Sequence, residues 1–479
     1  MGLLRQALSG AKWTGAANLA SVVLQFLQIA VLARLLHPED FGLMALVVLV
    51  VGLAQAFADV GLSGAIIRRQ DTTPATLSSL FWLNVFAGVV LCAILVLAAP
   101  LTAAAFGQPA MRDLVMLAAL SFLVTPPSQL FYTLLQKQLA FRTLAATDVA
   151  SAFCSATVAI ASAFLDQGVY SLLWGLLAGV LVRSAALIAI GMKNWRPSFH
   201  FRAAELHGYA RFGAFQMAER AVNFLGFNLD KLLIGALIGV HGLGLYSVAH
   251  QFVMKPFLLV TPIVNRVALP VFAMVQADDA RLRSGFLDGI RAVAMLLYPV
   301  YMGMIVLADP LVHVILGPTW RGAVPVLQLL AVLGFFYSIG NPIGSLLLAK
   351  GRVGLSFMLN VWMIVLYATA ILTGARSGIE GVAAALVIAT AFGLFPVGFL
   401  VRWILVRMRP GEYAGALLPA LVASLLMAVC VAGARALMPA SADPLAVLLA
   451  CTVLGALAYS AAILPLQWPF ILRIKNALS

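Results

Sequence analysis

About fourteen apolar stretches, each close to the length of one membrane crossing, follow one another along this 479-residue chain. A helix needs about 20 apolar residues to cross the hydrocarbon core of a bilayer. The connections between the stretches are short, and none could hold a folded domain outside the membrane. The sequence therefore predicts an all-α polytopic membrane protein. To within a few residues, we expect spans at 13–36, 41–66, 76–99, 112–134, 144–165, 168–192, 211–238, 243–272, 286–308, 322–349, 354–374, 378–404, 413–437 and 444–466.

The composition excludes a soluble protein of two or three domains. Hydrophobic residues make up 63% of the chain and charged residues only 10%, whereas a soluble globular protein carries about 25% charged residues. The mean hydropathy is +1.04 over the whole length. Apolar side chains this abundant cannot all be buried in one core, so most of the chain must face lipid.

The net charge of +13 is explained by the distribution of basic residues. Membrane proteins collect Lys and Arg in their cytoplasmic loops. Here most of these residues lie at the N-terminus, in loops that follow even-numbered spans, or at the C-terminus. This pattern puts both termini in the cytoplasm and requires no nucleic-acid partner. The residues are Arg5, Lys12, Arg68, Arg69, Lys137, Arg142, Lys193, Arg196, Arg202, Arg211, Arg281, Arg283, Arg291, Lys350, Arg352, Arg402, Arg407, Arg409, Arg473 and Lys475.

The chain contains an internal repeat. The tripeptide Phe41-Gly42-Leu43 opens the second span, and Leu243-Gly244-Leu245 opens the eighth, 202 residues later. Six spans separate the two copies, so both halves have the same topology. Repeats of this kind are related by an axis along the membrane normal, with a site expected between them near the midplane. We expect a six-helix lobe over 1–200, a second over 201–405 and a terminal helix pair over 406–479.

Polar side chains recur at helical spacing on four spans and form one stripe on each. The stripes are Thr14, Asn18, Ser21, Gln25 and Gln28; Gln55, Asp59 and Ser63; Gln216, Glu219, Asn223 and Asp230; and Tyr246, His250, Thr261 and Asn265. Arg220 and Lys231 flank the third stripe, and Lys255 and Arg266 flank the fourth. Offsets of 198 and 202 residues bring the stripes of the two halves into register. Stripes repeated in register favour a hydrophilic cavity between the halves.

Charges inside the spans suggest what the cavity holds. A charge at the centre of a spanning helix costs about 2.5–3.5 kcal/mol on insertion scales, so these groups face water or pair with one another. In the alternative interpretation, the acidic and basic groups neutralise one another across a packed interface, or the cations reach the membrane surface. Basic groups exceed acidic ones, and this surplus suits an anionic head group such as a pyrophosphate. The candidates for cargo binding are Asn18, Gln25, Arg183, Glu219, Arg220, Asn223, Lys231, His250, Lys255 and Arg266. The candidates for binding a coupling proton or Na⁺ are Asp59, Glu219 and Asp230.

No catalytic constellation is visible in the sequence. The six histidines are scattered, and there is no H-E-x-x-H motif, P-loop or nucleotide-binding motif. The four cysteines lie in apolar stretches without a C-x-x-C pair. We therefore expect no catalytic residue, metal site or cofactor, and we expect that this chain is not an enzyme.

Several segments resemble a known family. ARLLHPEDFG (33–42) and FADVGLSGAIIRR (57–69) resemble the opening of polysaccharide flippases of the MOP (multidrug/oligosaccharidyl-lipid/polysaccharide) superfamily. FWLNV (81–85), LQKQLAFR (135–142) and GNPIGSLLLAKGR (340–352) are similar to the colanic acid exporter branch of Wzx-type proteins. The ordered set of motifs covers about residues 5–360.

The resemblance implies a MATE-like fold of two six-helix lobes followed by a C-terminal helix pair. It also implies alternating-access transport of an undecaprenyl-pyrophosphate-linked oligosaccharide across the bacterial inner membrane, for exopolysaccharide or lipopolysaccharide biosynthesis. Its partners would be the lipid-linked anionic oligosaccharide, membrane lipids and other polysaccharide-assembly proteins. The family supplies no site residues that can be placed on this chain. The alternatives are a MATE-like exporter of small molecules or drugs, a membrane-bound polysaccharide polymerase, and a scaffold of an export complex.

Overall fold

The computed structural model describes residues 2–58, 66, 73–202, 217–274, 278–404, 408–439 and 442–478, and every regular element in these ranges is a helix. Twelve helical stretches among them are long and apolar enough to cross a membrane. Two of the stretches, Ala110–Lys137 and Gly354–Leu394, each cover more than one helix. The predicted seventh span, 211–238, lies partly outside the described residues. The all-α polytopic fold is thus confirmed, and the count of fourteen spans stays a prediction.

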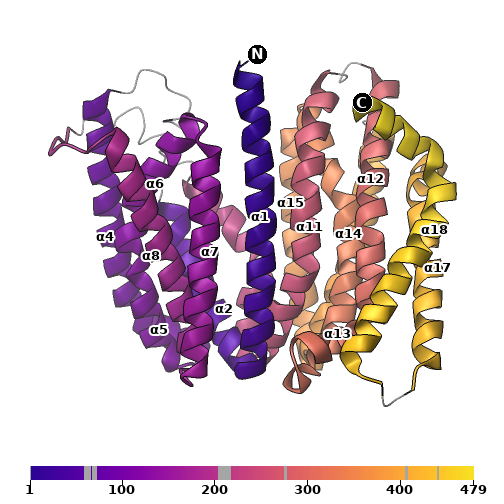
Figure 1. The fold of residues 1–479 in the computed structure, drawn as a ribbon, viewed down its shortest axis with the longest axis horizontal. Helices are drawn as coiled ribbons and strands as arrows, with labels where there is room; N and C mark the ends of the chain where they lie inside the picture. The colour runs from indigo at the N-terminus through magenta and orange to yellow at the C-terminus, as the bar shows by residue number, and fades with distance from the viewer. Residues whose placement is uncertain are drawn as a thin grey trace. The chain divides into compact units, whose positions relative to one another are not determined.

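The chain divides into two compact units, Met1–Gly244 and Leu245–Ser479. In the first, packing runs from α4 through α6, α8 and α7 to α1, and the indigo α1 lies beside α7 in Figure 1. The division into 1–200, 201–405 and 406–479 stays a prediction. The helices of this unit are α1 (Gly2–Leu35), α2 (Pro38–Ala58), α4 (Pro74–Phe106), α5 (Ala110–Ala119), α6 (Ser121–Lys137), α7 (Phe141–Phe164), α8 (Val169–Asn194), α10 (Leu229–Leu237) and the start of α11 (Val240–Met274).

The second unit contains the rest of α11 and the helices that follow it. Packing runs from α15 through α16, α14 and α12 to α17 and α18. A short helix, α13, follows α12 and was not predicted. The helices are α12 (Asp279–Val306), α13 (Ala308–Ile315), η1 (Pro318–Trp320), α14 (Ala323–Ala349), α15 (Val353–Gly374), η2 (Ala375–Ser377), α16 (Gly378–Ile404), α17 (Pro410–Leu437) and α18 (Pro444–Leu478).

Small residues bring α7 and α8 into close antiparallel contact. A Cβ atom at Gly175 would lie 2.5 Å from the Cβ of Ala159 and 2.8 Å from the carbonyl oxygen of Ser155. One helical turn further along α8, the Ser151 hydroxyl donates a 2.8 Å hydrogen bond to the carbonyl of Gly179. Close approach through small residues is a common way for membrane helices to pack, because lipid supplies little hydrophobic drive for association. This α7–α8 seam sets the register of the two helices.

The repeat-related glycines at the starts of α2 and α11 meet within the first unit. A Cβ atom at Gly42 would overlap the carbonyl oxygen of Val240, and one at Gly244 would overlap that of Pro38. The 202-residue offset exchanges these two contacts, so the crossing is self-complementary in the manner of a two-fold interface. Beside it, Glu39 and His241, also 202 residues apart, lie 2.6 Å from each other between Oε1 and Nδ1. The crossing fits the parallel repeat that the sequence predicts.

Candidate functional site

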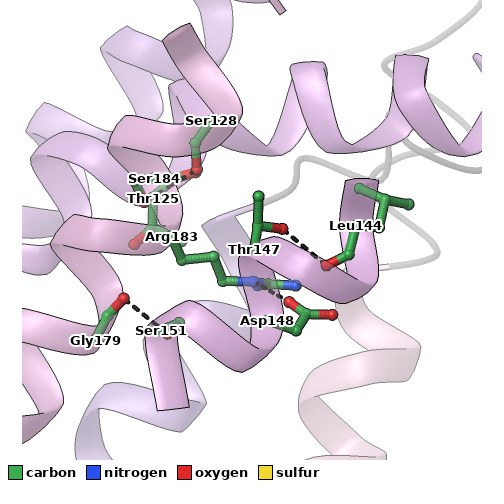
Figure 2. A network of polar contacts seen from close by, with 9 residues as sticks. All are labelled: Thr125, Ser128, Leu144, Thr147, Asp148, Ser151, Gly179, Arg183 and Ser184. Carbon is green, nitrogen blue, oxygen red and sulfur yellow. Dashed lines mark hydrogen bonds and ion pairs between the residues drawn. The ribbon is translucent and has the colours of Figure 1, made fainter. Parts of the chain in front are cut away.

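Arg183 lies near the middle of a membrane-spanning helix and has an acidic partner. It is the fifteenth of the 26 residues of α8, which places it about 16 Å or more from either end of the helix. Its Nε donates a 2.8 Å hydrogen bond to Oδ1 of Asp148 on α7, as Figure 2 shows. The pair continues the α7–α8 seam by one further turn beyond Gly179 and Ser151. Helix packing therefore aligns the two charges.

A third helix completes the surroundings of this arginine. The guanidinium carbon of Arg183 lies 5.1 Å from the centre of the Tyr132 ring on α6, a distance at which a cation is attracted to the face of an aromatic ring. The next residue, Ser184, accepts a 3.2 Å hydrogen bond from Ser128 of α6. Three helices thus fix the arginine, and Figure 2 shows the hydroxyl contacts that surround it.

The Arg183 side chain keeps an open edge. Within the part of the chain that the structure describes, its hydrogen bonding is confined to Nε, and neither terminal nitrogen donates a hydrogen bond. The side chain is 39% exposed and that of Asp148 is 41% exposed. Guanidinium N–H donors form a planar fork that matches carboxylate and phosphate oxygens. Arg183 can therefore bind an external anion while it keeps its bond to Asp148.

The predicted polar stripe on α1 is accessible. Asn18 and Gln25 are exposed. Leu19, Val23 and Leu27, on the other side of the helix, are exposed as well. In a membrane the apolar side can face lipid, whereas exposed amide side chains suit a hydrophilic environment. Because α1 packs along α7, this helix lies next to the one that carries Asp148.

The candidates of the predicted seventh and eighth spans lie in varied surroundings. Glu219 and Asn223 are exposed, and Arg220, Asp230 and Lys255 are partly exposed. Lys231 donates a 2.9 Å hydrogen bond from Nζ to Oδ1 of Asn228. His250 stacks on the buried Tyr246, with ring centres 5.5 Å apart, and the stripe residue Thr261 is also buried. The stripe on α11 is therefore packed at two of its positions.

Some predicted residues cannot be compared with the structure. Asp59 lies outside the described residues, as do Ser63 and Gln216. Arg266 belongs to α11, but its side chain lies outside the described part. Their roles in cargo or ion binding stay predictions.

The sequence interpretation missed Asp148 and Tyr132. Asp148 lies inside the predicted span 144–165 but is not among the predicted acidic candidates, so the surplus of basic over acidic groups within the spans is smaller than expected. A carboxylate inside an apolar stretch is a readable signal. Tyr132 carries no comparable signal, because an aromatic residue in a spanning helix is ordinary.

Comparison with known proteins identifies the family. The pattern of the family described as polysaccharide biosynthesis protein matches residues 31–325, which is more than half of the chain. The chain belongs to this family. It is 34% identical to the teichuronic acid biosynthesis protein TuaB of Bacillus subtilis (strain 168) over 409 residues, 84% of this chain and 83% of that protein. It is 33% identical to the lipopolysaccharide biosynthesis protein WzxC of Escherichia coli (strain K12), over 78% of this chain and 76% of that protein. The predicted Wzx-type membership is confirmed.

Solved structures confirm the predicted type of fold. The lipid II flippase MurJ in an inward closed conformation superimposes with a TM-score of 0.77 and 16% identity, covering 95% of this chain and 99% of that one. An inward-facing MATE multidrug resistance transporter of the MOP superfamily gives a TM-score of 0.61 and 15% identity, covering 82% and 98%. At these identities the likeness concerns the fold alone. The chain is a multi-pass membrane protein with a MurJ- and MATE-like architecture.

Proposed function

We propose that this protein flips an undecaprenyl-pyrophosphate-linked oligosaccharide repeat unit across the bacterial inner membrane by alternating access, for exopolysaccharide or lipopolysaccharide biosynthesis. The observation that carries the proposal is the open edge of Arg183 in the middle of α8 of a polysaccharide-biosynthesis family member. In this proposal the protein acts as a carrier and not as a catalyst. A MATE-like exporter of small molecules is the alternative, and no feature of the site favours it.

The chemistry of Arg183 suits a pyrophosphate. Bonds between a guanidinium and phosphate oxygens are charge-assisted and frequently bidentate, which adds both strength and geometric selectivity. Asp148 holds Nε and Tyr132 covers one face of the group. The two terminal nitrogens are then the donors that a phosphate can approach. Arg183 is already paired with Asp148 before cargo binds, so the empty carrier does not hold an uncompensated charge within the membrane.

The exposed amides of α1 suit the sugar part of the cargo. Asn18 and Gln25 are seven residues apart, which is nearly two full helical turns, so they lie on the same side of the helix. Both are exposed. Amide groups donate to and accept from hydroxyls, which oligosaccharides present in quantity. The proposal assigns the phosphates to Arg183 and neutral hydroxyls to the α1 stripe.

Direction and energy source complete the proposal. The basic loops support an orientation with both termini in the cytoplasm. Flipping then runs from the cytoplasmic to the periplasmic side, where other polysaccharide-assembly proteins take over the repeat unit. Asp59, Glu219 and Asp230 are the proposed sites for a coupling ion, and Asp148 joins them because it faces Arg183.

The proposal is tested in the bacterium from which the gene comes. Deletion of the gene should cause accumulation of a lipid-linked repeat unit on the cytoplasmic side, identified by mass spectrometry of extracted lipids. The wild-type gene should clear the intermediate, and the Arg183→Gln variant, produced at the same level, should not. A deletion strain that accumulates no polyprenyl-linked sugar would refute the flippase assignment.

A further inference from the structure

The segment that leaves α8, residues 195–202, is tied along the first turns of α4. The backbone N–H of Ser198 donates to Oγ of Ser78 at 3.1 Å, and that of Arg202 donates to Oγ of Ser79 at 3.2 Å. In return, Nε1 of Trp82 donates to the carbonyl of Ser198 at 2.9 Å. The Ser198 hydroxyl also donates to Oγ of Ser78 at 3.0 Å. Four hydrogen bonds therefore fix the path of this exit segment.

Packing secures the start of the exit segment as well. Ser78 and Ser79 are buried, so the α4 end of each of their bonds to the segment is shielded from water. The Trp195 ring lies 6.0 Å from that of Phe131 and packs against the apolar clusters under α4 and α6. A backbone held in this way presents its remaining side chains in a constant direction.

The side chains that the exit segment turns outward are aromatic and basic. Phe199 is 97% exposed and Phe201 is 55% exposed, although the Phe199 ring also stacks 5.3 Å from that of Trp82. Lys193, Arg196 and Arg202 are exposed beside them. Among the described residues, no packing buries these two large apolar rings, which lie among cations. Such a mixture matches the boundary between lipid tails and anionic head groups.

The length of α4 puts the exit segment at the depth of this boundary. Its 33 residues give a helix about 50 Å long, about 20 Å longer than the hydrocarbon core of a bilayer. If the two ends share the surplus, the first six or seven residues of α4 lie outside the core. Ser78 and Ser79 are then at head-group level, and Trp82 lies near the start of the hydrocarbon.

We propose that the exit segment is a binding site for anionic phospholipid. Phe199 and Phe201 insert between the outermost parts of the acyl chains, and Arg196 and Arg202 contact the head-group phosphate. The partner is a bilayer lipid with a net negative charge, such as phosphatidylglycerol. The site holds the exit segment, which follows α8, at the lipid surface. This role does not depend on what the protein transports.

Tryptophan fluorescence provides the test, because Trp82 touches Phe199. The purified full-length protein is reconstituted with mixtures of dibrominated phosphatidylglycerol or dibrominated phosphatidylcholine, whose bromines quench nearby indoles. We expect stronger quenching by dibrominated phosphatidylglycerol than by dibrominated phosphatidylcholine. We expect this difference in quenching to shrink in a Trp82→Phe reporter variant. Equal quenching by the two lipids, or a difference that survives Trp82→Phe unchanged, would overturn the proposal.

Charge and ring variants assign the contacts. A basic residue near an anionic surface contributes about five-fold in affinity, so Arg196→Gln with Arg202→Gln should reduce the preference for phosphatidylglycerol by about thirty-fold. Phe199→Ser with Phe201→Ser should weaken quenching by both lipids. Arg112→Gln, an exposed arginine in the first turn of α5, is the matched control and should retain the preference. A preference unchanged in the double arginine variant, or lost in the control, would contradict the assignment.

Discussion

At the scale of residues, the pairing of Arg183 with Asp148 serves two purposes that experiments can separate. A single charge at the middle of a spanning helix costs about 2.5–3.5 kcal/mol on insertion scales. The 2.8 Å bond to Asp148 reduces this cost for the folded chain. The same bond leaves the terminal nitrogens of Arg183 available to an anion. A structural ion pair needs both charges or neither, whereas a cargo site needs the arginine itself.

A set of neutral variants separates these two purposes. Asp148→Asn should lower the melting temperature, because it leaves Arg183 without its counter-charge in the membrane. The double variant Asp148→Asn, Arg183→Gln should regain most of the melting temperature but should not transport, since the phosphate donors are gone. Thermal unfolding of the purified protein and accumulation of the lipid-linked intermediate are the two measurements.

The conservative variant gives a further check on the same site. Arg183→Lys keeps the charge but not the planar fork of donors, so the protein should fold while transport falls by about ten-fold or more. Normal transport by the double neutral variant would show that the pair is structural and would remove Arg183 from the cargo site.

At the scale of elements, two close helix contacts depend on glycine. Gly175 and Gly179 allow α7 and α8 to approach, and the register of this seam places Asp148 opposite Arg183. Gly42 and Gly244 allow the starts of α2 and α11 to cross through backbone contacts. The first contact builds the candidate site, and the second joins two repeat-related segments.

The seam predicts a strong effect from one methyl group. Gly175→Ala puts a Cβ 2.5 Å from that of Ala159, and overpacking of this kind destabilises by about 1–3 kcal/mol. A companion change, Ala159→Gly, should restore part of the loss. The control is Gly433→Ala in α17, where nothing lies within 4 Å of the added atom, and it should be neutral or stabilising. Melting temperatures in one detergent provide the comparison, and equal values for the variants at 175 and 433 would contradict the seam.

The crossing of α2 and α11 predicts a functional effect. Gly42→Ala and Gly244→Ala each direct a Cβ at a backbone carbonyl, which cannot rotate away as a side chain can. We expect each variant to reach the membrane but to transport poorly, because the two helices can no longer meet at this point. Gly411→Ala, whose added atom would have open space, should transport normally. Wild-type transport by both crossing variants would show that the contact is dispensable.

At the scale of the whole molecule, the basic loops predict the orientation in the membrane. Lys and Arg are retained on the cytoplasmic side during insertion, so both termini should lie there. A C-terminal alkaline phosphatase fusion should be inactive, and a C-terminal green fluorescent protein fusion should fluoresce. Fusions placed after Arg112, near the start of α5, or after Arg435, near the end of α17, should show the reverse, because we expect these helix ends on the periplasmic side. An active C-terminal phosphatase fusion would place the C-terminus in the periplasm and would overturn the predicted topology.

The sequence alone predicted many of the helices closely and predicted the family of the chain. The hairpin of α15 and α16 shows how closely the expected and observed helix bounds agree. Spans were expected at 354–374 and 378–404, and α15 and α16 occupy Val353–Gly374 and Gly378–Ile404. Hydropathy works here because lipid forces each crossing to be a helix of nearly constant length. The 202-residue offset likewise anticipated that Gly42 and Gly244 are equivalent positions.

Only the tertiary structure showed which of the embedded polar groups lie together. Arg183 was a candidate by position, but its partner Asp148 lies 35 residues earlier on a different helix. They meet because Gly175 and Gly179 set the antiparallel register of α7 and α8. Hydropathy reports how deep a residue lies along its own helix and says nothing about which way it faces another helix. That choice comes from side-chain packing between helices, because lipid is as apolar as the helices and does not select the faces that meet.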